Sequence, residues 1–265
     1  MRCTRPRLRG GLAACVHVLP VCLALGTGQA VAQGAPAPGD VDLQLSHERS
    51  SGHYGDPTPT RIDQTTLTVR YHGTGWSTEL QLPWLQVRSG AASGGLPDSA
   101  GSGSSREQGA GDVWWRSSLT LRDFDTQGPG VDLTVKLKAA NGSASRGLGT
   151  GGRDMAVQLE VVQTVGLATV FGHLGWRHTG DPAGFKPYRN PWYGEVGAQH
   201  RLESGLDLGA YVTLREPIGR LGPLGEGTAY VAWRQGRQRW QLHFTRGWQT
   251  ASPQGAAGLT WRQRF

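Results

Sequence analysis

The stretch Val131-Asp132-Leu133-Thr134-Val135-Lys136-Leu137-Lys138-Ala139 decides the fold class. Apolar residues occupy every second position of this stretch, and Asp, Thr or Lys stand between them. Successive side chains of a β-strand point to opposite faces, so strict alternation predicts a strand with one apolar and one polar face. The same alternation recurs along most of the chain after residue 40. We therefore expect an all-β protein.

Twelve segments show this alternation, and each is long enough for a tilted membrane-spanning strand, which needs about 9–11 residues. They are residues 41–49, 61–72, 76–88, 112–123, 131–140, 153–162, 168–178, 192–202, 206–216, 227–235, 238–249 and 255–265. The connections after the even-numbered segments are short, and those after the odd-numbered segments are mostly longer. The longest connection, residues 89–111, is of low complexity and shows no strand pattern. Short turns at one end and long loops at the other are typical of an outer-membrane barrel.

Composition and aromatic placement agree with a membrane barrel. Charged residues make up 18% of the 265 residues and hydrophobic residues 37%, both below the usual values for a soluble domain. The 10 tryptophans gather near the segment ends, which predicts two aromatic girdles. The alternative is a soluble β-protein with aromatic residues in its core. The expected girdle on the short-turn side comprises Trp76, Trp233, Trp240 and Phe265, and that on the long-loop side comprises Trp84, Trp115, Trp176, Trp192 and Trp248.

The first 32 residues have the features of a secretory signal peptide. Four arginines precede an apolar stretch over residues 12–25, and Ala30-Val31-Ala32 is a small-residue cleavage site. A mitochondrial presequence and a short anchor helix are the alternatives. We expect a signal peptide over residues 1–32 and a barrel domain over residues 33–265. Its removal lowers the formal charge from +7 to +3, so we expect no nucleic-acid partner.

A barrel is required if this chain spans a membrane with strands. Every backbone N–H and C=O in the hydrocarbon must be paired internally, and only helices and closed barrels achieve this. We therefore predict a transmembrane antiparallel up-and-down β-barrel of twelve strands. Leu259, Trp261 and Phe265 share one face of the last segment and predict a recognition signal for the barrel-insertion machinery. Outer-membrane lipid and lipopolysaccharide are the other expected macromolecular partners.

The polar faces of the segments are expected to line the interior. Eleven basic residues and six acidic residues fall on those faces, which favours an anion-preferring pore. Cross-strand ion pairs that fill a closed barrel are the alternative. The pore-lining candidates are Arg116, Lys136, Lys138, Glu160, Arg177, Glu195, Arg201 and Arg215.

Five short stretches carry a resemblance to a known family. They are Ser50-Ser51-Gly52-His53-Tyr54-Gly55, Gly75-Trp76 leading to Leu82-Pro83-Trp84-Leu85-Gln86-Val87, Gly111-Asp112-Val113, Val135-Lys136-Leu137 followed by Gly147-Leu148-Gly149-Thr150-Gly151, and Asn190-Pro191-Trp192-Tyr193-Gly194. In these stretches the chain resembles the proteobacterial outer-membrane "transporter" family, which is related to the MetA-pathway-of-phenol-degradation β-barrel proteins. The resemblance implies an outer-membrane barrel and supplies no catalytic residues. Lys138-Ala139 stand where that family has Pro-Thr.

The function we expect is a passive pore or transporter for small solutes in the bacterial outer membrane, with a mild preference for anions. A closed barrel with a structural or surface-interaction role and functional outer loops is the first alternative, and a barrel enzyme is the second. The strands carry no His-x-Ser pair, and the long loops carry only scattered acids. We therefore expect no enzyme activity and no catalytic, cofactor-binding or metal site. The oligomeric state is left open.

Overall fold

The computed structural model describes residues 36–54, 58–89, 105–124, 128–181, 188–218 and 222–265, and almost all of them belong to β-strands or their turns. The expected signal peptide therefore lies outside the described residues and stays a prediction. The strands are β1 Val41–Gly52, β2 Thr60–Gly73, β3 Trp76–Ser89, β4 Ser105–Ala110, β5 Trp114–Arg122, β6 Gly130–Lys138, β7 Asp154–Val165, β8 Ala168–His178, β9 Trp192–Arg201, β10 Leu206–Arg215, β11 Leu224–Gln235, β12 Gln238–Gly247 and β13 Gly255–Arg264.

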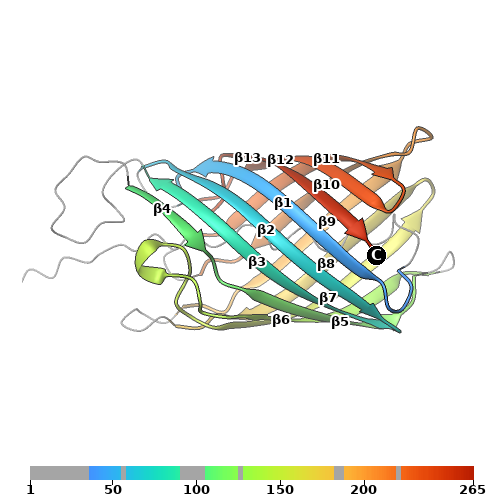
Figure 1. Cartoon of the computed structure of the whole chain (residues 1–265), viewed down its shortest axis with the longest axis horizontal. Coiled ribbons are helices and arrows are strands. Elements are labelled where there is room, and N and C mark those ends of the chain that lie inside the picture. Colours follow the sequence, from blue (N-terminus) through green and yellow to red (C-terminus); the bar gives the residue numbers. More distant parts are fainter. Residues whose placement is uncertain (1–35, 55–57, 90–104, 125–127, 182–187, 219–221) are drawn as a thin grey trace, which may run out of the picture.

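The strands form a closed antiparallel ring of twelve positions (Figure 1). Apart from β4 and β5, strands that are neighbours in sequence pair with each other, and β1 closes the ring by pairing with β13 from Asp42–Arg264 to Ser51–Gly255. Two strands, β4 and β5, share one position, because β4 pairs with the second half of β3 and β5 with its first half. The predicted twelve-stranded up-and-down barrel is confirmed.

The break between β4 and β5 lies opposite Pro83, in the middle of β3. Pro83 has no N–H to donate across the sheet, and its carbonyl accepts from Gly111 N at 2.9 Å. The prediction that residues 89–111 hold no strand is wrong for Ser105–Ala110, which form β4. The alternation pattern could not detect this strand, because its outward residues, Arg106 and Gln108, are polar and exposed.

The barrel is apolar outside and polar inside. In β7, Leu159 is 44% exposed on the outer face, whereas its neighbour Gln158 is 1% exposed on the inner face. A soluble protein buries such leucines, so this inverted pattern fits a surface that contacts lipid. The outer face carries a band of Leu and Val from most strands. No helix among the described residues is long and apolar enough to cross a membrane.

The two ends of the barrel differ as the sequence predicts. The C-terminus and the short turns lie at one end, and the longer connections lie at the other (Figure 1). The two-residue turn between β7 and β8 uses Gly166 at φ +61°, a conformation that favours glycine in tight hairpins. At this end, Trp240 stacks on Trp233 at 6.3 Å and contacts Trp261 at 6.3 Å, which builds part of the expected girdle.

Candidate functional site

The middle of the barrel interior holds a connected group of polar side chains from β5, β6 and β7. The Glu160 carboxylate accepts hydrogen bonds from Arg116 Nη2 at 2.6 Å, Thr134 Oγ1 at 2.8 Å and Gln158 Nε2 at 2.6 Å. These residues alternate with outward apolar ones, so the strand pleat points all four side chains to the inner face. The register of the neighbouring strands then brings them together. All four are buried, so each polar atom depends on these partners.

The adjoining part of the wall, β8 to β11, carries several aromatic rings. Phe171 and Tyr211 have ring centroids 6.4 Å apart, and Tyr211 and Tyr230 are 6.3 Å apart. The Lys136 ammonium lies 5.4 Å from the ring centre of Tyr193, within cation–π range. The interior therefore has a charged side and an aromatic side.

A second charged group lies in the interior near the long-loop end. Asp154 accepts from Lys138 Nζ at 2.8 Å and also from Arg177, and all three side chains are almost fully buried. Lys138 also contacts Thr150, and it lies 3.5 Å from Asp112. We call these five residues the mouth cluster. The cluster has two cations, Lys138 and Arg177, and two carboxylates, Asp112 and Asp154, so its formal charges balance.

The mouth cluster holds the long connection between β6 and β7 in place. Asp112 accepts from the backbone N–H groups of Gly142 and Thr150, each at 2.9 Å. The same connection contains a short 3-10 helix, Ala144–Arg146, and Arg146 pairs with Glu107 of β4 at 2.7 Å. The connection is thus tied both to the interior and to the neighbouring strand.

An apolar cluster packs beside the mouth cluster. Leu148, in the connection after β6, is buried with Ile62 of β2, with Leu85 and Val87 of β3 and with Tyr54. Tyr54 adopts φ +50°, and such backbone strain costs on the order of 1–3 kcal/mol and needs surrounding contacts to hold it. Burial raises the pKa of Tyr54, whose hydroxyl donates to Ser50 at 2.8 Å. The expectation that inward faces are polar therefore fails at this point.

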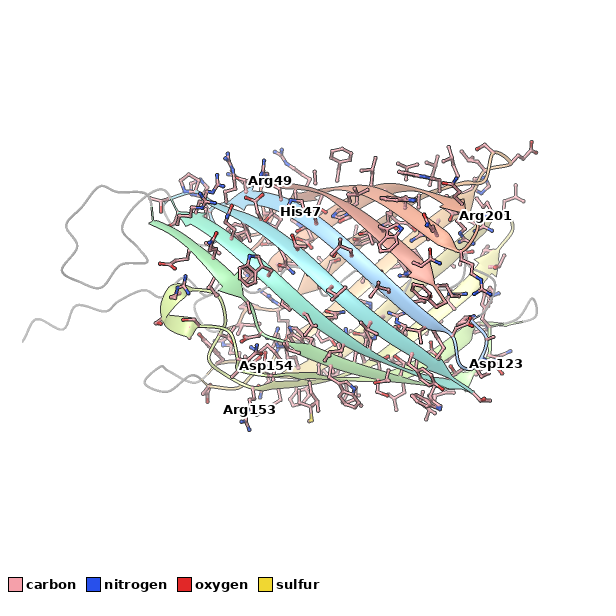
Figure 2. The ribbon with its side chains drawn as sticks, in the orientation of Figure 1. His47, Arg49, Asp123, Arg153, Asp154 and Arg201 are labelled. Carbon is pink, nitrogen blue, oxygen red and sulfur yellow. The ribbon has the colours of Figure 1, made fainter. Side chains whose placement is uncertain are left out.

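The short-turn end carries separate ion pairs. Asp42 accepts from Arg264 Nε at 2.9 Å and lies 3.0 Å from His72 Nε2. Asp207 pairs with Arg201 at 2.8 Å and with Arg234 at 3.4 Å. These pairs join neighbouring strands, and Arg201 lies at the rim near the C-terminus (Figure 2).

The structure places most predicted pore-lining residues deep in the interior. Arg201 differs, because its side chain is 49% exposed at the short-turn rim. Arg215 is partly buried, and its Nε donates to the Glu216 carbonyl at 3.3 Å. The residues buried in the interior are Arg116, Lys136, Lys138, Glu160, Arg177 and Glu195. Their role in lining a solute path stays a prediction.

Sequence reasoning missed five inward charged residues, one of which is Asp112 of the mouth cluster. Glu226 was missed because the predicted strand began at residue 227, whereas β11 begins at Leu224. The alternation of β1 places Asp42 and Glu48 inside, where Glu48 accepts from His243 at 2.9 Å, and that of β12 places Arg239 inside. These four additional acids and one additional base reduce the basic excess. The described residues contain no group of three His, Cys, Asp or Glu placed to hold a metal.

A cavity of about 540 Å³ lies at the long-loop end of β9 and β10. Its lining includes inward residues, Tyr193, Glu195 and Arg215, and outward residues such as Val212 and Leu214. Ligand cavities commonly measure about 300–1,000 Å³, so this space is large enough for a small organic molecule.

The predicted insertion residues share the outer face of the last strand. Leu259 and Phe265 are exposed, and Trp261 packs against Trp240. The backbone of Phe265 pairs with Val41 through N–H donation at 2.9 Å. The chain end is therefore fixed in the ring, while recognition by insertion machinery stays a prediction.

Similar folds occur among solved outer-membrane barrels. The COG4313 outer membrane channel from Pseudomonas putida F1 superimposes with a TM-score of 0.70 at 15% identity, covering 90% of this chain and 98% of that one. The KdgM porin in complex with disordered oligogalacturonate gives 0.53 at 7% identity, with coverage of 85% and 99%. The NanC porin gives 0.51 at 8% identity, with coverage of 84% and 98%.

No protein-family model matches the sequence, and no curated protein is similar to it. At these identities the structural likeness shows the fold alone. The barrel that the family resemblance implied is therefore confirmed, and the link to the phenol-degradation proteins stays a prediction.

Proposed function

We propose that this protein is an outer-membrane channel through which small solutes diffuse passively. The sidedness of the closed barrel carries the proposal, because an apolar exterior fits lipid and a polar interior fits water and solutes. The long-loop end faces the cell exterior in this arrangement, and the start of β1 and the C-terminus lie on the periplasmic side. The proposed location includes cleavage of the chain after Ala32.

The similar structures favour a channel over an enzyme. Their names describe an outer membrane channel and two porins. Inward bases still outnumber inward acids, so we propose a weak preference for anions.

A closed barrel with working outer loops is the second candidate. The full burial of Lys138 and Asp154 favours it, because charges that line an open water-filled pore are expected to contact water. In that case the interior ion pairs stabilise the wall and the outer loops bind a partner. The two candidates differ in one measurable property, which is conductance.

Planar-bilayer recording of the purified protein tests the channel. We expect discrete conductance steps, and we expect larger steps from L148S, because a polar side chain in the apolar cluster loosens the connection after β6. The matched control is R153Q, since Arg153 lies in the same connection and points outward (Figure 2). Absence of conductance in all three proteins would favour the closed barrel.

Assembly provides a test of the membrane location. We expect the wild-type protein in the outer-membrane fraction, where it should show a heat-modifiable gel shift. Replacing the terminal aromatic residue, as in F265D, should reduce the assembled fraction because the predicted insertion signal is lost. A protein that remains soluble in the periplasm would contradict the location, and normal assembly of F265D would contradict the signal.

A further inference from the structure

Three arginines lie side by side across β2, β3 and β4 near the long-loop end. Arg61 is directly opposite Arg88, and Arg88 is directly opposite Arg106. Residues in such positions have Cβ atoms about 4.5–5.5 Å apart, and like charges there destabilise a sheet. We call these residues the arginine row. The row is an unfavourable arrangement for the protein alone.

The arginine row faces away from the interior. Arg61 and Arg106 are exposed, whereas the neighbours Ile62 and Val87 belong to the buried apolar cluster inside the barrel. Alternation along each strand therefore places the row on the outer surface. The proposed solute path does not use it.

Acidic residues near the row already have other partners. Asp63 pairs with Arg49 at 2.5 Å, and Glu107 pairs with Arg146 at 2.7 Å. Within the described residues, no ion pair involves a member of the row. Arg88 donates through Nη2 to Gln86 at 2.8 Å, but its buried Nε has no hydrogen-bond partner in the described part of the chain. The row thus carries unsatisfied donor capacity for an anion.

The row lies just beyond the apolar band. Along the outer face of β3, Leu80 and Leu82 are followed by Trp84, which is 56% exposed, and then by Gln86 and Arg88. Four residues at about 3.4 Å each, on a strand tilted by about 40°, place Arg88 roughly 10 Å beyond Trp84. Because interfacial tryptophans mark the headgroup level, the row lies in the outer headgroup layer.

We propose that the arginine row binds the phosphate groups of lipid A, the phosphorylated glycolipid anchor of lipopolysaccharide. Guanidinium groups donate paired hydrogen bonds that match phosphate oxygens. A bound phosphate would neutralise the like charges of the row. The inference rests on the proposed outer-membrane location, but it does not depend on solute passage.

Native mass spectrometry of the purified barrel in detergent, titrated with bisphosphorylated lipid A, tests this site. We expect the triple variant R61Q/R88Q/R106Q to bind at least about tenfold more weakly, because charge-assisted hydrogen bonds to phosphate are lost. The matched control is R153Q, since Arg153 is another outward, exposed arginine at the same end (Figure 2). Its affinity should stay within about twofold of the wild type.

Two further lipids define the ligand. Lipid A without phosphates should bind the wild type and the triple variant equally, and phosphatidylglycerol should bind the wild type more weakly than lipid A. Equal lipid A binding by the triple variant and the wild type would overturn the proposal, as would equal binding of phosphatidylglycerol and lipid A. If the triple variant fails to fold, R106Q alone should show the same direction, and unchanged binding would overturn the site. Loss of conductance with lipid A binding intact would contradict only the channel.

Discussion

Arginines occur on both faces of this barrel, and their surroundings are opposite. Inside, Arg177 meets the carboxylate of Asp154, and Arg116 meets that of Glu160 at 2.6 Å. Outside, Arg88 is directly opposite two other arginines. An interior charge without a partner is expensive, and Arg116 and Arg177 each meet a carboxylate there. An outer charge in the headgroup layer can take its partner from the membrane.

Arginine therefore has a different role on each face of the barrel. Arg116 and Arg177 each pair with an interior carboxylate, so removal of either should cost stability. The outer row is repulsive in the protein alone, so loss of one member should stabilise the isolated barrel. Substitutions on the two faces should therefore change the free energy of unfolding with opposite signs.

The largest effect is expected from D154N. The change leaves Lys138 and Arg177 buried without their full countercharge, and breaking a buried pair costs about 3–5 kcal/mol. Urea unfolding of the barrel in detergent, followed by tryptophan fluorescence, measures the loss. The adjacent variant R153Q is the control, because Arg153 points outward (Figure 2), and it should change stability by less than about 0.5 kcal/mol. Equal stability of D154N and the wild type would contradict the stabilising role of this interior ion pair.

A smaller loss is expected from E160Q. The amide oxygen can still accept hydrogen bonds, but Arg116 loses its countercharge, at a cost of about 1.5–3 kcal/mol. The same variant should shift ion selectivity toward anions, as read from the reversal potential under a salt gradient. Glu203, exposed in a short turn, provides the control E203Q. A selectivity shift of the same size in E203Q would show that Glu160 does not act through the pore.

Alternation predicted the barrel because lipid and interior impose opposite preferences on successive residues. The pattern fails where that contrast ends. Ser105–Ala110 lie beside the polar outer end of β3, so their strand has no apolar face to detect. Leu85 and Val87 reverse the rule because the connection after β6 folds in and covers them through Leu148. That contact depends on two segments more than 50 residues apart, which no local period encodes.

The sequence predicted which charged residues of the candidate site point inward, but not how they pair. The two-residue period of a strand is enough to predict that Arg116, Glu160 and Glu195 point into the barrel. Which charge meets which depends on register, and register is set by the turns and by the whole ring rather than by one strand. The arginine row depends in addition on β4, so it could not be read from the sequence.

The smallest effect, and the one of opposite sign, is expected from R106Q. Removing one charge relieves repulsion with Arg88, so the isolated barrel should gain about 0.2–1 kcal/mol of unfolding free energy. The gain should shrink at high salt, because exposed charges are screened. The control is again R153Q, which has no arginine directly opposite it in the described pairings. A loss of stability in R106Q, without lipid present, would mean that the protein itself stabilises the row. Arginines on the outer and inner faces would then both contribute to the stability of the isolated barrel.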